Sequence, residues 1–158
     1  MELYDVAREM PWLGRGLLHL ADRNTEPALT TLLGEQGFAV YRIEGSRVVD
    51  KPSLFPEMAE GLRFPDYFGN NWDALIDSLG RIGKRPERRV AIFWRNGDVS
   101  AGADLGVFCE AVHWILAVRD DLLTIPDEAS GDEDDLDLVQ IELFIFGRGG
   151  AFRRPGGE

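Results

Sequence analysis

The sequence predicts an α/β fold in which a small three-stranded parallel sheet is covered by helices. Segments with the composition of β-strands alternate with segments whose apolar residues repeat at helical spacing. The middle strand segment, residues 89–94 (RVAIFW), is apolar almost throughout. Such a strand is typical of a parallel sheet that is buried on both faces, with strands joined by right-handed crossovers.

Residues 1–36 are expected to form an N-terminal extension that packs on the domain. MELYDVAREMPWL can begin a short helix, and GLLHL at 16–20 can add one extra strand to the sheet. A longer helix is predicted from Thr25, a suitable N-cap, to Gly37, because Pro27 falls in the first turn, where proline is tolerated. The apolar residues of this helix at helical spacing are Leu29, Leu32 and Leu33.

The main domain is expected over residues 37–147, followed by a flexible glycine-rich tail at 148–158. Its three strands are predicted where β-branched and aromatic residues are dense, at 38–43, 89–94 and 138–146. Its helices are predicted at 53–62, 71–82 and 105–119.

The overall composition excludes several classes of protein. A hydrophobic content of 44% with 28% charged residues is typical of a globular chain. The net charge of -11 disfavours direct binding to nucleic acid, which depends on neutralising phosphates with Lys and Arg. The single cysteine, Cys109, allows no internal disulfide, and neither a signal peptide nor a run of about 18 apolar residues is present. We therefore predict a soluble, reduced, cytoplasmic protein.

Much of the negative charge is concentrated in one segment. Residues 127–137 (DEASGDEDDLD) contain seven acidic residues. A dense run of like charge is usually solvated, so we expect an acidic loop inserted before the last strand.

The stretch FPDYFGNNWDALIDSLG at 64–80 joins an aromatic turn to an acidic helix. Its apolar residues Trp72, Leu75, Ile76 and Leu79 form one stripe, so Asp73 and Asp77 share the solvent side. Like charges at this spacing cost about 0.2–0.5 kcal/mol. Asp73 lies in the first turn, where the helix dipole favours an anion, but Asp77 lies beyond it and we assign it no basic partner in the chain. We expect a positive group from outside the chain to bind Asp77.

An enzymatic use of these carboxylates is the main alternative. Two carboxyl groups can act as acid and base in glycoside hydrolysis, but carboxylates in water both stay ionised. The two histidines, His19 and His113, fall in separate elements and suggest no base or metal pair. Two carboxylates also fall short of the roughly six ligands that calcium or magnesium requires. We predict no catalytic residue, no metal site and no cofactor.

The segment from Tyr67 to Asp77 (YFGNNWDALID) resembles the aromatic-Gly-x-Asn-x-Asp-Ala-Leu-x-Asp motif of the barstar family, the intracellular inhibitors of barnase-type ribonucleases. The order of predicted elements extends the resemblance over residues 38–146. A second segment, VFCEA at 107–111, resembles the stretch of the family's third helix in which an acidic residue completes the inhibitory surface. Residues 1–36 lie outside the resemblance.

The resemblance implies a barstar-like three-layer fold and a protein that inhibits by covering a ribonuclease active site. Asp77 would take the place of a substrate phosphate, with Asp73 and Glu110 beside it. The resemblance further implies three contacts before and at the start of the helix: packing by Tyr67, close backbone approach at Gly69 and a polar contact from Asn71. Those three residues can equally serve the turn and the helix cap.

The expected partner is a basic, extracellular-type ribonuclease of the barnase class, bound as a 1:1 heterodimer by a chain that is monomeric alone. The chain departs from the family pattern at Ile76, where a tryptophan is expected, and this leaves the target open. Two alternatives remain at this point. One is a small hydrolase that uses Asp73, Asp77 and Glu110, and the other is a barstar-like immunity or adaptor protein whose partner is not a ribonuclease.

Overall fold

The sheet of this protein has four parallel strands rather than three. The computed structural model describes residues 2–123 and 138–156, so the acidic segment 127–137 lies outside the described residues. The strands are β1 (His19–Asp22), β2 (Ala39–Glu44), β3 (Arg89–Arg95) and β4 (Gln140–Gly147), and their order in the sheet is β1-β4-β3-β2. All three pairings are parallel. The prediction of a parallel α/β sheet is confirmed, and its strand number is corrected by β1.

The side chains of β1, the additional strand, alternate between buried and partly exposed positions. In β1, His19 and Ala21 are buried while Leu20 and Asp22 are partly exposed. The strand begins near the end of the GLLHL segment and pairs with β4, from His19 opposite Phe144 to Asp22 opposite Gly147. The expected N-terminal extension therefore contributes one strand to the same sheet.

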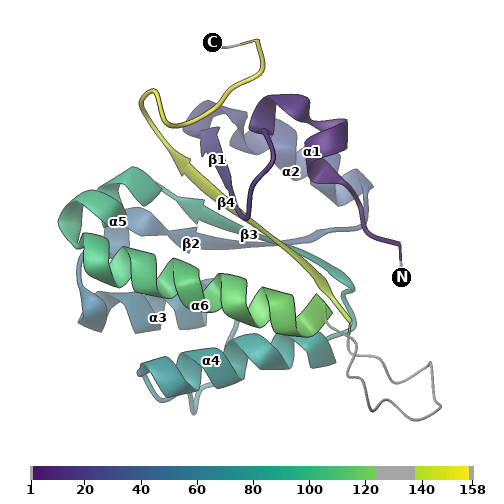
Figure 1. Ribbon diagram of the computed structural model, residues 1–158. Helices are drawn as coiled ribbons and strands as arrows, with labels where there is room; N and C mark the ends of the chain where they lie inside the picture. The colour runs from purple at the N-terminus through teal and green to yellow at the C-terminus, as the bar shows by residue number, and fades with distance from the viewer. Residues whose placement is uncertain (1, 124–137, 157–158) are drawn as a thin grey trace, which may run out of the picture.

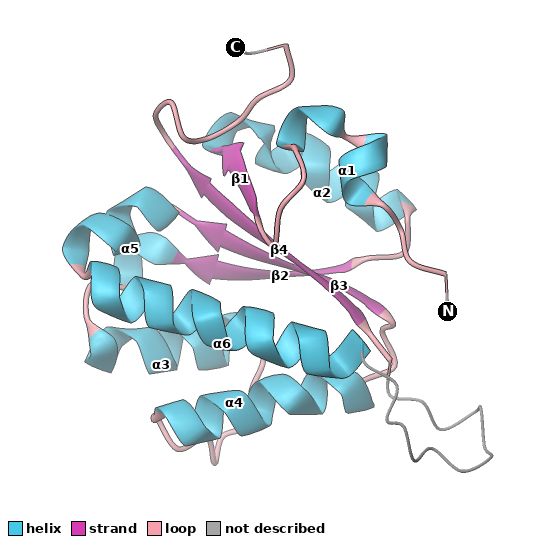
Figure 2. Ribbon diagram, in the orientation of Figure 1, coloured by secondary structure: helices cyan, strands magenta, loops and turns pink. Residues whose placement is uncertain are grey.

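The helices are α1 (Val6–Glu9), α2 (Glu26–Glu35), α3 (Lys51–Gly61), α4 (Trp72–Gly80), α5 (Gly97–Ala103) and α6 (Leu105–Leu123). Helix α5 was not expected from the sequence, because GDVSAGA carries no apolar repeat. Helices α1 and α2 cover one face of the sheet, and α3, α4 and α6 lie on the other (Figures 1 and 2). No helix within 2–123 or 138–156 combines the length and apolar character needed to cross a membrane.

The central strand β3 supplies core residues to both faces, as its apolar sequence predicted. Val90, Ile92 and Trp94 belong to the larger cluster, which includes buried residues of α3, α4 and α6. Ala91 and Phe93 belong to the smaller cluster beneath α1 and α2. Because successive strand side chains point to opposite faces, one strand holds the two helical layers together.

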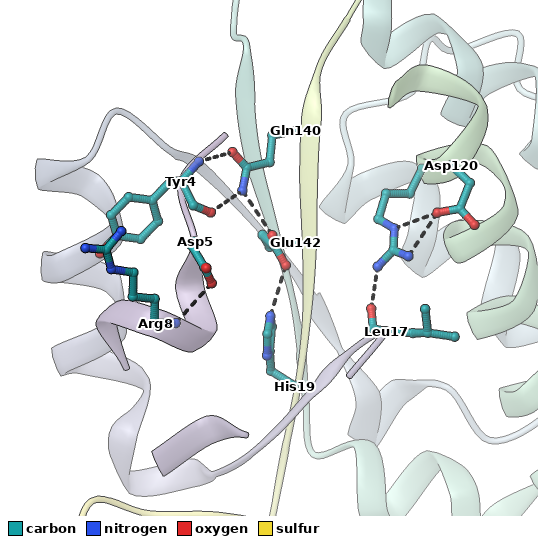
Figure 3. Close-up of polar contacts among 9 residues, drawn as sticks. Tyr4, Asp5, Arg8, Leu17, His19, Asp120, Gln140 and Glu142 are labelled. Atoms are coloured by element: carbon teal, nitrogen blue, oxygen red, sulfur yellow. Dashed lines mark hydrogen bonds and ion pairs between the residues drawn. The ribbon is translucent and has the colours of Figure 1, made fainter. Parts of the chain in front are cut away.

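A network of hydrogen bonds joins the N-terminal segment to β4 (Figure 3). The amide of Gln140 both accepts from the N–H of Tyr4, at 2.9 Å, and donates to its carbonyl, at 2.8 Å. The same amide donates to Glu142, whose other oxygen lies 2.9 Å from Nε2 of the buried His19. These hydrogen bonds join the N-terminal segment, β1 and β4, whereas Nδ1 of His19 is buried without a partner among the described residues.

The tail that composition predicted to be flexible is fastened to β1 by Arg153. The N–H of Arg153 donates to the carbonyl of Leu20 at 3.0 Å, and the N–H of Asp22 donates to the carbonyl of Arg153 at 2.7 Å. The ring of Phe152 lies over Gly147, where a Cβ atom would come within 2.5 Å of Cζ. Arg153 therefore pairs with the edge of β1 that faces away from β4.

Candidate functional site

The loop that precedes α4 is held from beneath by aromatic rings. The ring centroids of Phe68 and Phe64 lie 5.1 Å apart. The rings of Trp72 and Phe55 meet edge to face, with their centroids also 5.1 Å apart. Offset and edge contacts of this kind stabilise aromatic clusters beyond their burial. Because Phe68 packs inward, the neighbouring side chain of Tyr67 is left 74% exposed.

Asn71 caps the start of α4. Its Oδ1 accepts from the N–H of Ala74 at 2.8 Å, which satisfies one of the donors that a helix start leaves unpaired. Its Nδ2 donates to the carbonyl of Gly69 at 2.7 Å, and Asn70 takes a left-handed conformation with a φ of 39°. Asn71 therefore has a structural role, whether or not it also contacts a partner.

Gly69 is exposed, and the free fold does not demand glycine there. Its φ lies outside the left-handed region, and an added Cβ would approach Ala74 Cβ and Asn71 Nδ2 no closer than 3.4 Å. A small adjustment accommodates that distance. The packing of the free chain therefore does not account for glycine at this position.

The acidic residues of α4 face solvent, opposite the stripe that packs on the core. Leu75 and Leu79 are buried, whereas Asp73 and Asp77 are exposed. Within the described part of the chain, Asp73 makes no hydrogen bond or ion pair. Both carboxylates are therefore accessible to a partner from solvent.

Asp77 does have a basic partner, contrary to the sequence-based expectation. Nε of Arg81 lies 3.2 Å from Oδ2 of Asp77, one turn along the helix axis. Nη1 of the same guanidinium donates to the hydroxyl of Tyr67 at 2.9 Å. Arg81 therefore links two of the predicted site residues, and the i, i+4 spacing in the sequence was the signal that could have revealed it.

Glu110 lies on α6, the helix that packs beside α4 on the same face of the sheet (Figure 2). Its side chain is exposed and makes no hydrogen bond or ion pair with a described residue. The structure thus brings Tyr67, Gly69, Asn71, Asp73 and Asp77 together on one loop and helix, and places Glu110 on the neighbouring helix.

This surface offers little of what catalysis or metal binding requires. In residues 2–123 and 138–156, no group of three or more His, Cys, Asp or Glu side chains is arranged to hold a metal ion. The carboxylates of α4 lie on the outside of a helix, whereas acid–base catalysis by paired carboxylates takes place in pockets. The arrangement suits contact with a large, positively charged surface.

A family model described as Barstar (barnase inhibitor) matches residues 38–132, more than half of the chain. The chain belongs to the barstar family. The family match includes α4, its loop and Glu110, whereas α1, β1, α2 and β4 lie outside it. No curated protein sequence matches the chain. The barstar family consists of inhibitors, not enzymes.

Proposed function

We propose that this barstar-family protein inhibits a basic, barnase-type ribonuclease by covering its active site with the loop 64–71 and α4. The observation that carries the proposal is the exposure of Asp73 and Asp77 on the helix of a family described as barnase inhibitors. In the complex, Asp77 occupies the position of a substrate phosphate. Asp73 and Glu110 lie beside it, and Tyr67 packs on the ribonuclease.

The environment of Asp77 changes when the proposed complex forms. In the free protein Asp77 is exposed, so its pair with Arg81 contributes only about 0.3–0.5 kcal/mol. In the complex the carboxylate is desolvated among positive groups of the enzyme. Removing one partner of such a buried pair costs about 2–5 kcal/mol, a range to which the barnase–barstar pair itself contributes. Asp77 is therefore the expected energetic centre of the interface.

The same charges also explain recognition at a distance. A chain with a net charge of -11 attracts a basic partner and accelerates encounter, an effect for which barnase and barstar are a standard example. The proposed complex is a 1:1 heterodimer of a chain that is monomeric alone. Its place is the cytoplasm, where a ribonuclease made for export would otherwise degrade the cell's own RNA.

The direct test is a titration of a purified barnase-type ribonuclease with the protein. The protein alone should release no nucleotides from RNA, and an equimolar amount should abolish hydrolysis by the ribonuclease. Asp77→Ala should raise the inhibition constant by at least about 30-fold, since 2 kcal/mol corresponds to roughly that factor. Glu35→Ala is the matched control, because Glu35 is an exposed acid on α2, across the sheet.

Three outcomes would contradict the proposal. Hydrolysis of RNA or a glycoside by the protein alone would favour the hydrolase interpretation, in which Asp73, Asp77 and Glu110 act on a substrate. Equal inhibition by Asp77→Ala and wild type would show that α4 is not the inhibitory surface. A pull-down from the native host that recovers a non-ribonuclease partner, lost in Asp77→Ala, would identify an immunity or adaptor protein instead.

A further inference from the structure

A hollow that no residue of α4 lines lies at the carboxyl ends of β1 and β4. It encloses about 810 Å³. Its lining consists of Pro11, Trp12, Asp22 and residues 149–154. Ligands of open parallel sheets bind at the carboxyl ends of the strands, and cavities of this size accommodate small organic molecules. The location and size both favour a ligand site.

The walls of this hollow are fixed by packing rather than by a loose tail. Residues 148–156 run from the end of β4 back past β1 and the N-terminal segment (Figure 1). Backbone hydrogen bonds fasten Arg153 to β1 on both sides of its peptide. The guanidinium of Arg153 lies directly on Gly14, where a Cβ atom would come within 2.7 Å of Nη1. Gly14 also has a φ of 72°, a conformation in which a side chain would be strained.

The guanidinium groups of the two arginines that line the hollow have no partner among the described residues. Among the described residues, Arg153 and Arg154 donate no side-chain hydrogen bond and form no ion pair. Arg95, by contrast, is held by Glu26 through two hydrogen bonds of 2.6 and 2.7 Å. The lack of a carboxylate partner leaves the two guanidinium groups free for a ligand.

Backbone groups beside the arginines extend the set of free donors. The N–H groups of Gly149, Gly150 and Ala151 donate to no acceptor within the described residues. Successive free N–H groups in a glycine-rich turn form a concavity that favours anions. The hollow therefore combines fixed positive charge with backbone donors, as phosphate sites do.

The remaining lining adds an aromatic and an acidic group. Trp12 is half-buried and offers an indole surface for stacking. Asp22 uses Oδ1 to cap the turn at Asn24 and lies where β1 ends, a position from which carboxylates of parallel sheets bind ribose hydroxyls. We propose that this hollow binds a mononucleotide, with the phosphate on Arg153, Arg154 and the free N–H groups, the base on Trp12 and the ribose at Asp22.

The distribution of charge on the protein favours a mononucleotide over an RNA chain as the ligand of this hollow. An extended nucleic acid must lie along a basic surface, and the net charge of -11 opposes that. A single phosphate needs only the local cluster. This site is independent of the proposed inhibitory surface, because none of the six residues predicted to contact the ribonuclease lines it.

The test is equilibrium binding to the full-length protein by calorimetry, with adenosine and guanosine 5′-monophosphate, the matching nucleosides, inorganic phosphate and a short single-stranded RNA as probes. A monophosphate should bind saturably with a Kd below about 1 mM and at least about tenfold more tightly than its nucleoside or phosphate. Arg154→Gln and Trp12→Leu should each weaken it about tenfold. Arg148→Gln is the matched control, because Arg148 belongs to the same tail but does not line the hollow.

Four results would overturn the proposal. They are no saturable binding of any monophosphate, binding that survives both Arg154→Gln and Trp12→Leu, an equal loss in Arg148→Gln, and binding of the RNA without the mononucleotides. Thermal melting establishes that each variant is folded. Arg154 is exposed and makes no side-chain hydrogen bond with a described residue, so its substitution tests the site even where Trp12→Leu disturbs packing.

Discussion

Nε of Arg81 lies 3.2 Å from Oδ2 of Asp77, so the carboxylate proposed to contact a ribonuclease is already paired in the free protein. Both side chains are more than half exposed, at 56% and 65%. The pair is therefore weak, and a guanidinium or ammonium group from a partner can replace Arg81 at small cost.

Arg81→Ala should strengthen inhibition slightly. The substitution removes the competing counter-ion of Asp77, whose contribution of about 0.3–0.5 kcal/mol corresponds to roughly a twofold gain in affinity. Stopped-flow association with the ribonuclease should show a faster on-rate at low salt. Arg148→Ala makes the same charge change away from α4 and should show a smaller effect. A loss of affinity in Arg81→Ala would mean that Arg81 itself contacts the enzyme or holds Tyr67 in place.

Asn71→Ala should destabilise the protein by about 1 kcal/mol, within a range of roughly 0.5–2 kcal/mol. The reason is the lost cap at the N–H of Ala74. Urea denaturation followed by circular dichroism measures this difference. Asn71→Asp keeps an acceptor at the cap and should retain most of the stability, so an equal loss in both variants would contradict the capping role.

Gly69→Ala should separate folding from inhibition. The free chain accommodates a Cβ atom at this position, so the free energy of unfolding should change by less than about 0.5 kcal/mol. If the ribonuclease backbone approaches Gly69 closely, the added methyl group should weaken inhibition by about tenfold or more. Unchanged inhibition would remove Gly69 from the interface.

Gly45→Ala and Gly34→Ala should act in opposite directions. A Cβ atom at Gly45 would lie 2.1 Å from the carbonyl oxygen of Arg95, which belongs to the rigid end of β3. We expect a loss of at least about 1–3 kcal/mol. At Gly34 in α2 nothing lies within 4 Å, so alanine should add roughly 0.5–1 kcal/mol through its helix preference. Thermal and urea unfolding check both, and a stable Gly45→Ala would refute the close packing of Gly45 against β3.

Glu44 should make the stability depend on acidic pH. Burial alone would raise its pKa, but hydrogen bonds from Ser46 and Asn96 and the charge of Arg95 hold the pKa below its ordinary value. A carboxyl with a lowered folded pKa contributes stability above its unfolded pKa, about 4.3 for Glu, and loses it as the pH falls through the folded value.

Urea denaturation of wild type and Glu44→Gln between about pH 7 and pH 3 measures this contribution. The difference in free energy of unfolding should be constant near neutrality and shrink below about pH 4.3. Glu60→Gln, an exposed change on α3, is the control. A difference that grows on acidification would contradict the sign of the effect.

Much of the fold follows from local sequence signals. The helix start at Asn71 and the apolar run of β3 were predicted within one or two residues, because a cap and an apolar strand are specified by neighbouring residues. Helix α5 was not predicted, since its stability comes from contacts made at a distance. Ser100, for example, accepts from the indole of Trp94 at 3.0 Å and donates to the carbonyl of Gly45 at 2.7 Å.

One expectation about the side chains of α4 is confirmed and another is wrong. The exposure of Asp73 and Asp77 followed from the apolar stripe on the opposite side of α4. The pairing of Asp77 with Arg81 did not enter the sequence analysis, although its spacing was visible. The fastening of the tail could not be predicted, because Arg153 meets Leu20 only after the whole chain has folded.

The pairing of β1 with β4 has a consequence for how the molecule forms in the cell. Strand β1 is made before the other three strands, and its neighbour β4 is made after them, with Leu20 opposite Ile145. Bringing such distant segments together slows folding. During translation β1 cannot pair with β4 until residues 140–147 have left the ribosome, so the four-stranded sheet is completed only after its last strand has emerged.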